Sequence, residues 1–457
     1  MGERMVVIGA DATGMSAASQ ARRLRGVEEL EIVVFEKGNH ASYSACGIPY
    51  WVAGDVAEAD DLIARSATEH RARDIDLRLR TEVTEIDTVR KRVLSRDLDN
   101  DAEAWTSYDK LVLATGATPV RPPLPGIDAE GVYGVQTLDD GQALIEALGS
   151  VTGRAAVVIG AGYIGVEMAE ALVRRGFEVT MITRSTEPMA TLDPDMGALV
   201  REAMVGMGIR LVRDSEVTGM RTASDGRVCA VTTADREYPA DIVVLGIGVR
   251  PATDLARDAG LPLGDSGGLL TDLAQRVRGH DDIWAGGDCV EVLDLVSGTL
   301  AHIPLGTHAN KHGQVIGTGV GGGYATFPGV VGTAMSKVCD LEVARTGLGE
   351  KDAQRAGLRF HAVTIESTGR AGYFPGAQPM AVKMLAERRT GRLLGVQIVG
   401  RDGAAKRIDI AAVALTARMT VEQVTALDLG YAPPFSPVWD PVLVAARAAV
   451  RAVALGL

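Results

Sequence analysis

Two stretches of the chain share one pattern of hydrophobic and polar positions. Residues 5–8 form a short apolar run. A glycine turn follows this run, and then an Ala/Ser-rich helical segment extends through Arg25. A second apolar run over residues 31–35 ends at Glu36. A buried strand, a glycine turn, a helix and a second strand that ends in an acid are typical of a dinucleotide-binding unit. The pattern therefore predicts a parallel α/β unit with a nucleotide at its first turn.

The first glycine turn reads GADATG over residues 9–14. Glycines permit the tight turn, and the N-terminal amides of the helix then face a pyrophosphate whose charge the helix dipole favours. Glu36 is placed to accept a hydrogen bond from a ribose hydroxyl. Asp11 stands where the middle glycine normally lets the backbone approach the phosphates. The first turn thus departs from the usual pattern at one position.

The same pattern recurs with a complete fingerprint, GAGYIG over residues 160–165. An apolar run over residues 155–159 precedes it, and a helix through Arg175 and a strand over residues 178–183 follow. One glycine fingerprint alone also fits a plain structural turn, whereas two copies in the same context indicate two bound dinucleotides and electron transfer between them. Arg184 ends the second copy, where it can pair with a 2′-phosphate and favour NADPH or remain a solvated charge. NADH stays possible.

Composition and charge narrow the possible partners. The chain has 457 residues, 46% of them apolar and 23% charged, as in a soluble protein of two to four domains. Its formal charge of -12 disfavours nucleic acid and anionic lipid. We find neither a signal peptide nor a membrane-length apolar run, and expect a cytoplasmic protein with no membrane partner. The four cysteines lack zinc spacing, so we expect no metal site.

Cys46 is the candidate for redox chemistry. It follows the first nucleotide unit, and a helix beginning near it would hold its sulfur close to the redox-active ring of a bound dinucleotide. The N-terminal dipole of that helix would lower the thiol pKa. The alternative is a small buried hydrophobic residue. A C-x4-C redox pair would place a second cysteine at position 51, but this residue is Trp51, and no other cysteine lies nearby in sequence. A single thiol can still cycle through a mixed disulfide or a sulfenic acid.

Five further segments complete a pattern that spans nearly the whole chain. They are ASQARR at residues 18–23, CGIPY at 46–50, MSKV at 335–338, KRID at 406–409 and YAPPFS at 431–436. In these segments the chain resembles the single-cysteine branch of the pyridine nucleotide-disulfide oxidoreductase family, and within it the coenzyme A-disulfide reductases. The resemblance implies an α/β fold with two Rossmann-like dinucleotide-binding domains, for FAD and NAD(P), and a C-terminal α+β dimerisation domain.

The resemblance also implies which residues hold the cofactors. Residues 111–118 and 283–290, apolar runs that end in glycine turns, resemble flavin-contacting segments, in which Asp288 accepts from the ribityl chain. An ordinary buried strand and turn is the alternative for each. Tyr163 would swing aside for the nicotinamide, and Glu167 would steady the flavin edge or be a solvated helix acid. The expected FAD contacts are Gly9, Asp11, Ala12, Gly14, Glu36, Lys37, Thr115, Gly116 and Asp288. The expected NAD(P) contacts are Gly160, Gly162, Tyr163, Ile164, Gly165, Glu167, Arg184 and Gly248.

Domain limits and a homodimer follow from the same resemblance. We expect an FAD domain from residues 1–118 and 250–323, an NAD(P) domain from 119–249 and a dimerisation domain from 324–457, with the glycine run 317–323 at a boundary. Tyr373 and Tyr431 would reach the partner subunit's cysteine, or simply pack in the interface. Gln20, Arg23 and Ser42 match positions that line a coenzyme A channel, although Arg23 also suits a helix C-terminus without any ligand.

The predicted function is NAD(P)H-dependent reduction of a low-molecular-weight disulfide such as coenzyme A disulfide, through FAD and the catalytic residues Cys46, Tyr373 and Tyr431. Ala45, where these enzymes carry Asn, and Phe374 beside Tyr373 depart from the family pattern. The water-forming oxidases and peroxidases of the family that the chain resembles place a His in the first glycine turn, and its absence over residues 9–14 disfavours peroxide chemistry. Two alternatives remain open. One is an oxidase, or a reductase of quinones, metals or other acceptors that uses the flavin alone, and the other is a redox-sensing protein.

Overall fold

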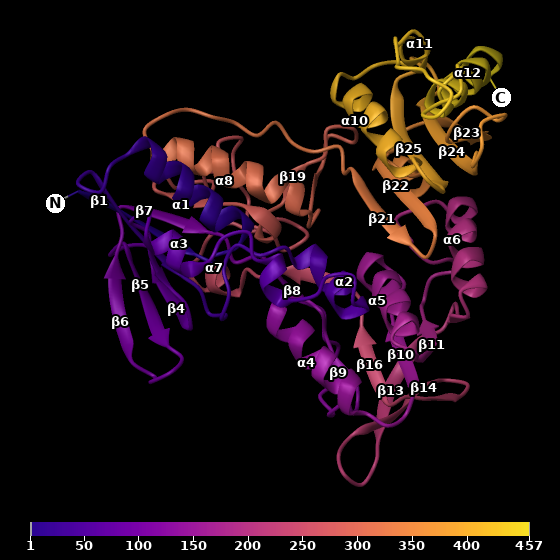
Figure 1. Ribbon diagram of the computed structural model, residues 1–457. Helices are drawn as coiled ribbons and strands as arrows, with labels where there is room; N and C mark the ends of the chain where they lie inside the picture. The colour runs from indigo at the N-terminus through magenta and orange to yellow at the C-terminus, as the bar shows by residue number, and fades with distance from the viewer. Residues whose placement is uncertain (1, 457) are drawn as a thin grey trace.

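The computed structural model describes residues 2–456, which fold into three units that are each built on one large sheet (Figure 1). The first sheet is parallel, with strand order β18-β7-β1-β2-β3. Its strands are β1 (Glu3–Ile8), β2 (Leu30–Phe35), β3 (Asp76–Arg78), β7 (Lys110–Leu113) and β18 (Ile283–Ala285). The chain leaves this sheet after β7 and returns at β18, so a long insertion interrupts the unit.

Two helices cover one face of the first sheet, and an antiparallel sheet lies by the other. The helices α1 (Ala12–Leu24) and α8 (Gly306–Val320) pack side by side (Figure 1). The antiparallel strands are β4 (Thr81–Asp87), β5 (Arg92–Asp97) and β6 (Glu103–Ser107). Smaller elements are α3 (Ala67–Arg71), α7 (Asp254–Asp258), β19 (Val292–Leu293) and β20 (Leu300–Ala301).

The inserted unit repeats the parallel architecture, with strand order β12-β11-β10-β16-β9. Its strands are β9 (Val132–Tyr133), β10 (Ala155–Ile159), β11 (Glu178–Ile182), β12 (Arg210–Val212) and β16 (Ile242–Leu245). Its helices are α4 (Leu138–Ser150), α5 (Tyr163–Arg174) and α6 (Pro194–Gly206), and β13 (Val217–Thr222), β14 (Val228–Thr233) and β15 (Glu237–Pro239) form a small antiparallel sheet. The antiparallel pair β8 (Ala117–Pro119) and β17 (Val249–Pro251) joins both units.

The third unit is antiparallel, with strand order β21-β22-β25-β24-β23. Its strands are β21 (Ala334–Val338), β22 (Leu341–Gly347), β23 (Phe360–Thr368), β24 (Pro379–Glu387) and β25 (Leu393–Gly400). Its helices are α9 (Glu350–Arg355), α10 (Ile408–Thr416), α11 (Val421–Thr425) and α12 (Pro441–Leu455). Every residue of the central strand β25 is buried, as expected for a strand that is covered on both faces.

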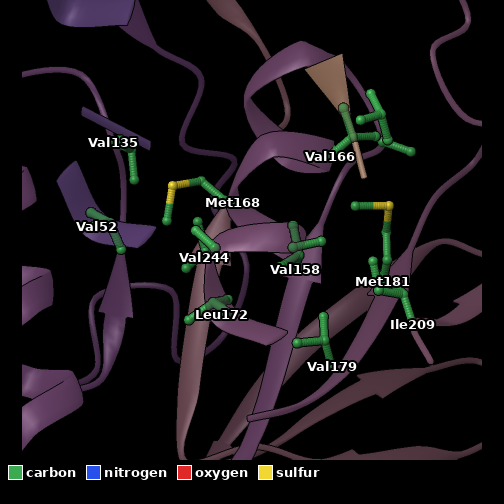
Figure 2. Packing of buried hydrophobic residues seen from close by; sticks show 14 of the residues in the cluster. Val52, Val135, Val158, Val166, Met168, Leu172, Val179, Met181, Ile209 and Val244 are labelled. Carbon is green, nitrogen blue, oxygen red and sulfur yellow. The ribbon is translucent and has the colours of Figure 1, made fainter. Parts of the chain in front are cut away.

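One apolar core joins the three units beneath the predicted redox residue. Helix α2 (Ile48–Ala53), which directly follows Cys46, contributes Trp51 and Val52 to this core. Figure 2 shows Val52 near Met168 of α5 and Val135, beside the strands of the second sheet. Residues of β21, β22 and β25 belong to the same core. The segment that carries Cys46 is therefore packed against the second unit, although it follows the first unit in sequence.

The glycine run 317–323 lies at the C-terminal end of α8. Its first four residues form the last turn of α8. A Cβ atom on Gly317 would lie 2.5 Å from the Ala17 carbonyl oxygen of α1, so the glycine allows the two helices to approach closely. The strand–turn–helix–strand pattern predicted at both glycine turns is confirmed, because β1 pairs in parallel with β2 and β10 with β11.

Candidate active site

The first glycine turn connects β1 to α1 at the carboxyl edge of the first sheet. Gly9 has φ +101°, and a Cβ atom there would collide with the Ala114 carbonyl oxygen. A Cβ atom on Gly14 would collide with the carbonyl oxygen of Gly9. No side-chain hydrogen bond caps the N-terminus of α1, which begins at Ala12, so the first turn of the helix can present amides to a ligand. This cradle fits an anionic group such as a pyrophosphate.

Glu36 stands at the end of β2, beside this turn. Its carboxylate oxygens accept hydrogen bonds from the Ala10 amide at 2.8 Å and the Gly38 amide at 2.7 Å. These bonds fix the orientation of the carboxylate and leave acceptor capacity for the hydroxyls of a ribose. Lys37 follows and is exposed.

Asp11 links the glycine turn to the segment that precedes Cys46. Its carboxylate accepts a hydrogen bond from the Tyr43 amide at 3.3 Å. Burial raises the pKa of Asp11 to about 6, and the nearby carboxylates of Glu36 and Asp288 add to the shift. The structure therefore places an acid of raised pKa where the second turn has Gly162.

Asp288 lies in a short turn that follows β18, on the same sheet edge. A Cβ atom on Gly287 would lie 2.6 Å from the Thr13 hydroxyl oxygen, so this turn is pressed against the start of α1. Burial raises the pKa of Asp288, and His302 opposes the shift. The Thr115 hydroxyl, after β7, donates to the Ala252 carbonyl at 2.7 Å, and Gly116 has φ +69° with open space beside it. Four strand ends thus surround one site, as expected for a parallel sheet.

Cys46 lies in a single helical turn, residues 45–47, just before α2. The residue is exposed, yet enough protein surrounds its sulfur that desolvation raises the thiol pKa. The carboxylates of Glu167, Asp288 and Asp11 raise it further. The predicted lowering of the Cys46 pKa is therefore wrong, because burial raises this pKa and the three carboxylates raise it further.

The second glycine turn repeats the geometry of the first. Gly160 has φ +98°, and Cβ atoms at Gly160 and Gly165 would collide with the carbonyl oxygens of Gly246 and Gly160. Gly162 caps the N-terminus of α5 with open space on its side, and Tyr163 and Ile164 begin the helix. Burial raises the pKa of Tyr163. Gly248, with φ +94°, is exposed after β16.

Glu167 connects the second turn with the third unit and with Cys46. Its carboxylate accepts a hydrogen bond from the Ser336 hydroxyl of β21 at 2.6 Å. Burial raises the pKa of Glu167, which the Ser336 bond opposes. The alternative of a solvated helix acid is wrong for Glu167. Ser336 lies in the MSKV segment that carries the family resemblance, but the sequence assigned it no role, because its contact with Glu167 is long-range.

Arg184 follows β11, and its side chain is 81% exposed, with its guanidinium 4.0 Å from the Glu216 carboxylate. The nearest acid in sequence, Glu187, forms ion pairs with Arg201 at 2.9 Å and Arg213 at 3.0 Å. No free carboxylate therefore stands directly at this strand end among the described residues 183–187.

A basic cavity of about 400 Å³ opens at the end of α1, and Ser19, Arg22, Arg23, Arg73 and Ile75 line it. Arg23 donates to the Gln20 amide oxygen at 2.9 Å. Ser42, which has φ +52°, is hydrogen-bonded to His70 at 2.9 Å. Burial lowers the pKa of His70 to about 4, and nearby Arg65 and Arg73 contribute. Arg73 and His70, which no sequence motif marked, thus connect the cavity with the Cys46 segment.

Tyr373 and Tyr431 lie on two loops of the third unit, with side chains 78% and 47% exposed. Tyr373 lies close enough to Tyr431 to raise the pKa of Tyr431. Further exposed apolar side chains, Phe435, Val438 and Trp439, follow Tyr431 in the chain. The structure brings the two tyrosines together within one subunit.

Most of the chain matches two domains of one known protein family. Residues 3–313 match the family described as pyridine nucleotide-disulphide oxidoreductase, and residues 333–441 match the dimerisation domain of that family. The chain belongs to the pyridine nucleotide-disulphide oxidoreductase family. The predicted family, the enzyme class and the fold class of two Rossmann-like domains with a dimerisation domain are thereby confirmed. Membership implies that this oxidoreductase uses FAD and NAD(P)H, which the two glycine cradles fit.

Three proteins are similar to this oxidoreductase over nearly its whole length. The NAD(P)H coenzyme A polysulfide/persulfide reductase of Pyrococcus horikoshii is 37% identical over 450 residues, which is 98% of each chain. The reduced CoADR-RHD of Bacillus anthracis has a TM-score of 0.95 at 34% identity and covers 99% of this chain and 81% of its own. An engineered water-forming NADPH oxidase, derived from a Lactobacillus brevis enzyme and bound to NADPH, has a TM-score of 0.94 at 28% identity and covers 99% of each chain.

The described part of the oxidoreductase adds two observations. Residues 2–456 contain no helix that is long and apolar enough to cross a bilayer. All four cysteines are free thiols in this part of the chain. The individual contacts predicted for FAD, NAD(P)H and coenzyme A, and the three domain limits, stay predictions.

Proposed function

We propose that this oxidoreductase reduces a low-molecular-weight disulfide, such as coenzyme A disulfide, with NADPH through the single thiol of Cys46. The observation that carries the proposal is the position of Cys46 between both nucleotide cradles. The carboxylates that face its sulfur come from the first turn, from the turn after β18 and from α5. A sulfur in this position is accessible both to a flavin and to a substrate from solvent.

The residues would divide the reaction as follows. FAD, when bound, accepts hydride from NADPH and supplies the electron pair that a disulfide needs. Reduction breaks the bond between the Cys46 sulfur and a capping thiol, which leaves Cys46 as a thiolate. This thiolate attacks one sulfur of a new disulfide, and the other sulfur departs and takes a proton. The net reaction converts NADPH, one proton and one disulfide into NADP⁺ and two thiols.

The proton would come from the dimerisation domain of a partner subunit. We propose a homodimer in which Tyr431 of the partner subunit protonates the leaving thiolate, with Tyr373 of the partner subunit hydrogen-bonded to its hydroxyl. The exposure of both hydroxyls and of the apolar side chains around them supports this arrangement, since such a patch suits a protein interface. Three carboxylates face Cys46, so a neutral acid is a better proton donor than another charged group.

The basic cavity supports coenzyme A as the thiol. Arg22, Arg23 and Arg73 offer guanidinium groups that bind phosphate in a bidentate manner. Gln20 and Ser42 supply polar contacts between this cavity and Cys46. Because the Pyrococcus relative is named a coenzyme A polysulfide/persulfide reductase, the acceptor class extends to persulfides of the same carrier.

Arg184 supports NADPH over NADH. Its side chain is free to meet a 2′-phosphate, and Glu187 is held by two arginines. The engineered NADPH oxidase carries five substitutions, of which one removes an aspartate, two introduce arginine and one introduces serine. This chain has Arg184 and Ser185 directly after β11.

A second candidate is an oxidase that passes electrons from the flavin to oxygen. The likeness to a water-forming oxidase over the whole chain favours it. The raised pKa of the Cys46 thiol also keeps more of it protonated and less reactive toward disulfides at neutral pH.

Rapid mixing distinguishes the candidates. The enzyme is reduced with NADPH and mixed with coenzyme A disulfide, coenzyme A persulfide, a quinone or oxygen, in wild type and Cys46→Ser. We expect a coenzyme A substrate to reoxidise the wild-type flavin fastest and Cys46→Ser to lose this reaction. Equal rates with oxygen in both proteins, without reoxidation by either sulfur substrate, would contradict the proposal.

A further inference from the structure

Arg407 is a buried arginine whose contacts join three segments of the third unit. Its side chain is 9% exposed and forms an ion pair with Asp440, Nε to carboxylate, at 3.0 Å. Its Nη2 donates to the Gly369 carbonyl at 2.6 Å and to the Phe435 carbonyl at 2.7 Å. Its Nη1 donates to the carbonyl of Gly403. Four acceptors therefore surround one guanidinium.

Two of these acceptors belong to the loops that carry the tyrosine pair. Gly369 begins the β23–β24 loop, which contains Tyr373, and Phe435 lies four residues after Tyr431. The Ala371 amide donates to the Pro433 carbonyl at 3.0 Å, which is a direct link between the loops. Neither tyrosine lies in a helix or strand, so the loops depend on such links for their relative position.

The geometry of the guanidinium explains why arginine occupies this position. Its planar group offers donors in fixed directions, so one side chain holds both loop carbonyls and the Asp440 carboxylate at once. A lysine ammonium would keep the ion pair with Asp440 but could not reach the three loop and turn carbonyls in the same arrangement. Asp440 in turn caps α12, where its carboxylate accepts from the Val442 amide at 2.9 Å.

We infer that Arg407 is a positioning residue for proton delivery: it holds the two loops at the spacing that joins the Tyr373 and Tyr431 hydroxyls. This inference rests on the proposed function, in which Tyr431 of the partner subunit acts on the leaving thiolate. Arg407 would therefore influence the disulfide half of the reaction and leave the reduction of the flavin by NADPH unchanged.

A double-mutant cycle in the full-length enzyme tests the inference. We expect Tyr431→Phe to slow reoxidation by coenzyme A disulfide by about a hundredfold, in the range of lost general acids. Arg407→Lys should slow the same step at least about tenfold, and the double variant should be no slower than Tyr431→Phe alone. Lys406→Gln is the control, because Lys406 is adjacent but exposed and pairs only with Asp409.

A merely structural role would give a different result. If Arg407→Lys slows the NADPH half-reaction equally, or slows the step further in the Tyr431→Phe background, the inference is overturned. Asp440→Asn serves as a second variant. It keeps the shape of the side chain but removes the charge that pairs with the buried Arg407 guanidinium, so it should slow the same step with the same sign as Arg407→Lys.

A spectroscopic readout separates this inference from the proposed function. Fluorine NMR of fluorotyrosine-labelled enzyme follows the titration of Tyr431, identified by comparison with Tyr431→Phe. Tyr373 raises the pKa of Tyr431, so Arg407→Lys, which loosens the two loops, should lower that pKa toward its ordinary value. An unchanged pKa overturns the inference. A lowered pKa together with a Tyr431→Phe enzyme of normal rate supports the positioning by Arg407 and refutes the acid role of Tyr431.

Discussion

The two glycine turns have nearly the same backbone and different side chains. Gly9 and Gly160 both have φ near +100°, and both lie against the backbone of a neighbouring strand end. The first turn adds Asp11 and ends its second strand with Glu36, whereas the second has Gly162 at the matching position and ends with Arg184. We infer from the comparison that the shared backbone shape forms each phosphate cradle, while a few side chains determine which dinucleotide each cradle prefers.

Breaking each cradle separately should give the largest effects. In Gly9→Ala the new Cβ collides with the Ala114 carbonyl oxygen, and in Gly160→Ala with that of Gly246. Both positions also have left-handed backbone that disfavours alanine. We expect Gly9→Ala to lose bound FAD and appear colourless, and Gly160→Ala to keep FAD but lose at least about a hundredfold in its reduction by NADPH.

Absorbance spectra and rapid reduction kinetics measure these outcomes. Gly176→Ala is a matched control, because its φ of +84° is equally strained but no atom lies near a new Cβ. Loss of FAD from Gly160→Ala, with retention in Gly9→Ala, would reverse the assignment of the two cradles.

Removing the Arg184 charge that follows β11 should have an intermediate effect on the use of NADPH. Arg184→Ala removes an exposed guanidinium, and we expect kcat/KM for NADPH to fall about tenfold to a hundredfold while that for NADH changes little. Steady-state kinetics with both nucleotides check this. Arg221→Ala, an exposed arginine of the same unit that pairs with Glu237, is the control. An equal fall for both nucleotides would show that Arg184 does not read the 2′-phosphate.

Changing Asp11, the side chain that distinguishes the first glycine turn from the second, should have the smallest effect, a change in how FAD affinity depends on pH. The pKa of Asp11 is raised from 3.8 to about 6, so its charge appears as the pH rises through that value. A negative carboxylate opposes a nearby pyrophosphate, and FAD affinity should therefore fall about tenfold between pH 5 and pH 8. Asp11→Asn keeps an acceptor for the Tyr43 amide and removes the charge, so its FAD affinity should be nearly independent of pH.

Fluorescence titration of FAD at several pH values measures this effect. Asp128→Asn, an exposed acid paired with Arg121, is the control and should retain the wild-type dependence. A wild-type affinity that does not fall with pH would mean that Asp11 does not face the phosphates.

Much of this architecture could be predicted from the sequence, because glycine turns and apolar strands are local signals. The chain order β1-α1-β2 and β10-α5-β11 and the position of Glu36 at the end of β2 agree with expectation. The pKa of Cys46 could not be predicted, since it depends on carboxylates that three separate segments bring together.

Other features depend on long-range contacts that the motifs themselves do not reveal. Ser336 and Arg407 act through contacts with residues far away in sequence, Glu167 and Gly369 respectively. The glycine run 317–323 includes residues that allow α8 to pack closely against α1, which is visible only once both helices are placed.

The central claim is that the Cys46 sulfur exchanges electrons with the bound flavin. Anaerobic titration with NADPH, followed by absorbance, tests it most directly. In wild type oxidised with coenzyme A disulfide, we expect about two equivalents of NADPH per FAD, because the flavin and the Cys46 disulfide each accept an electron pair. Cys46→Ser should accept about one equivalent. The same uptake in both proteins would contradict the account.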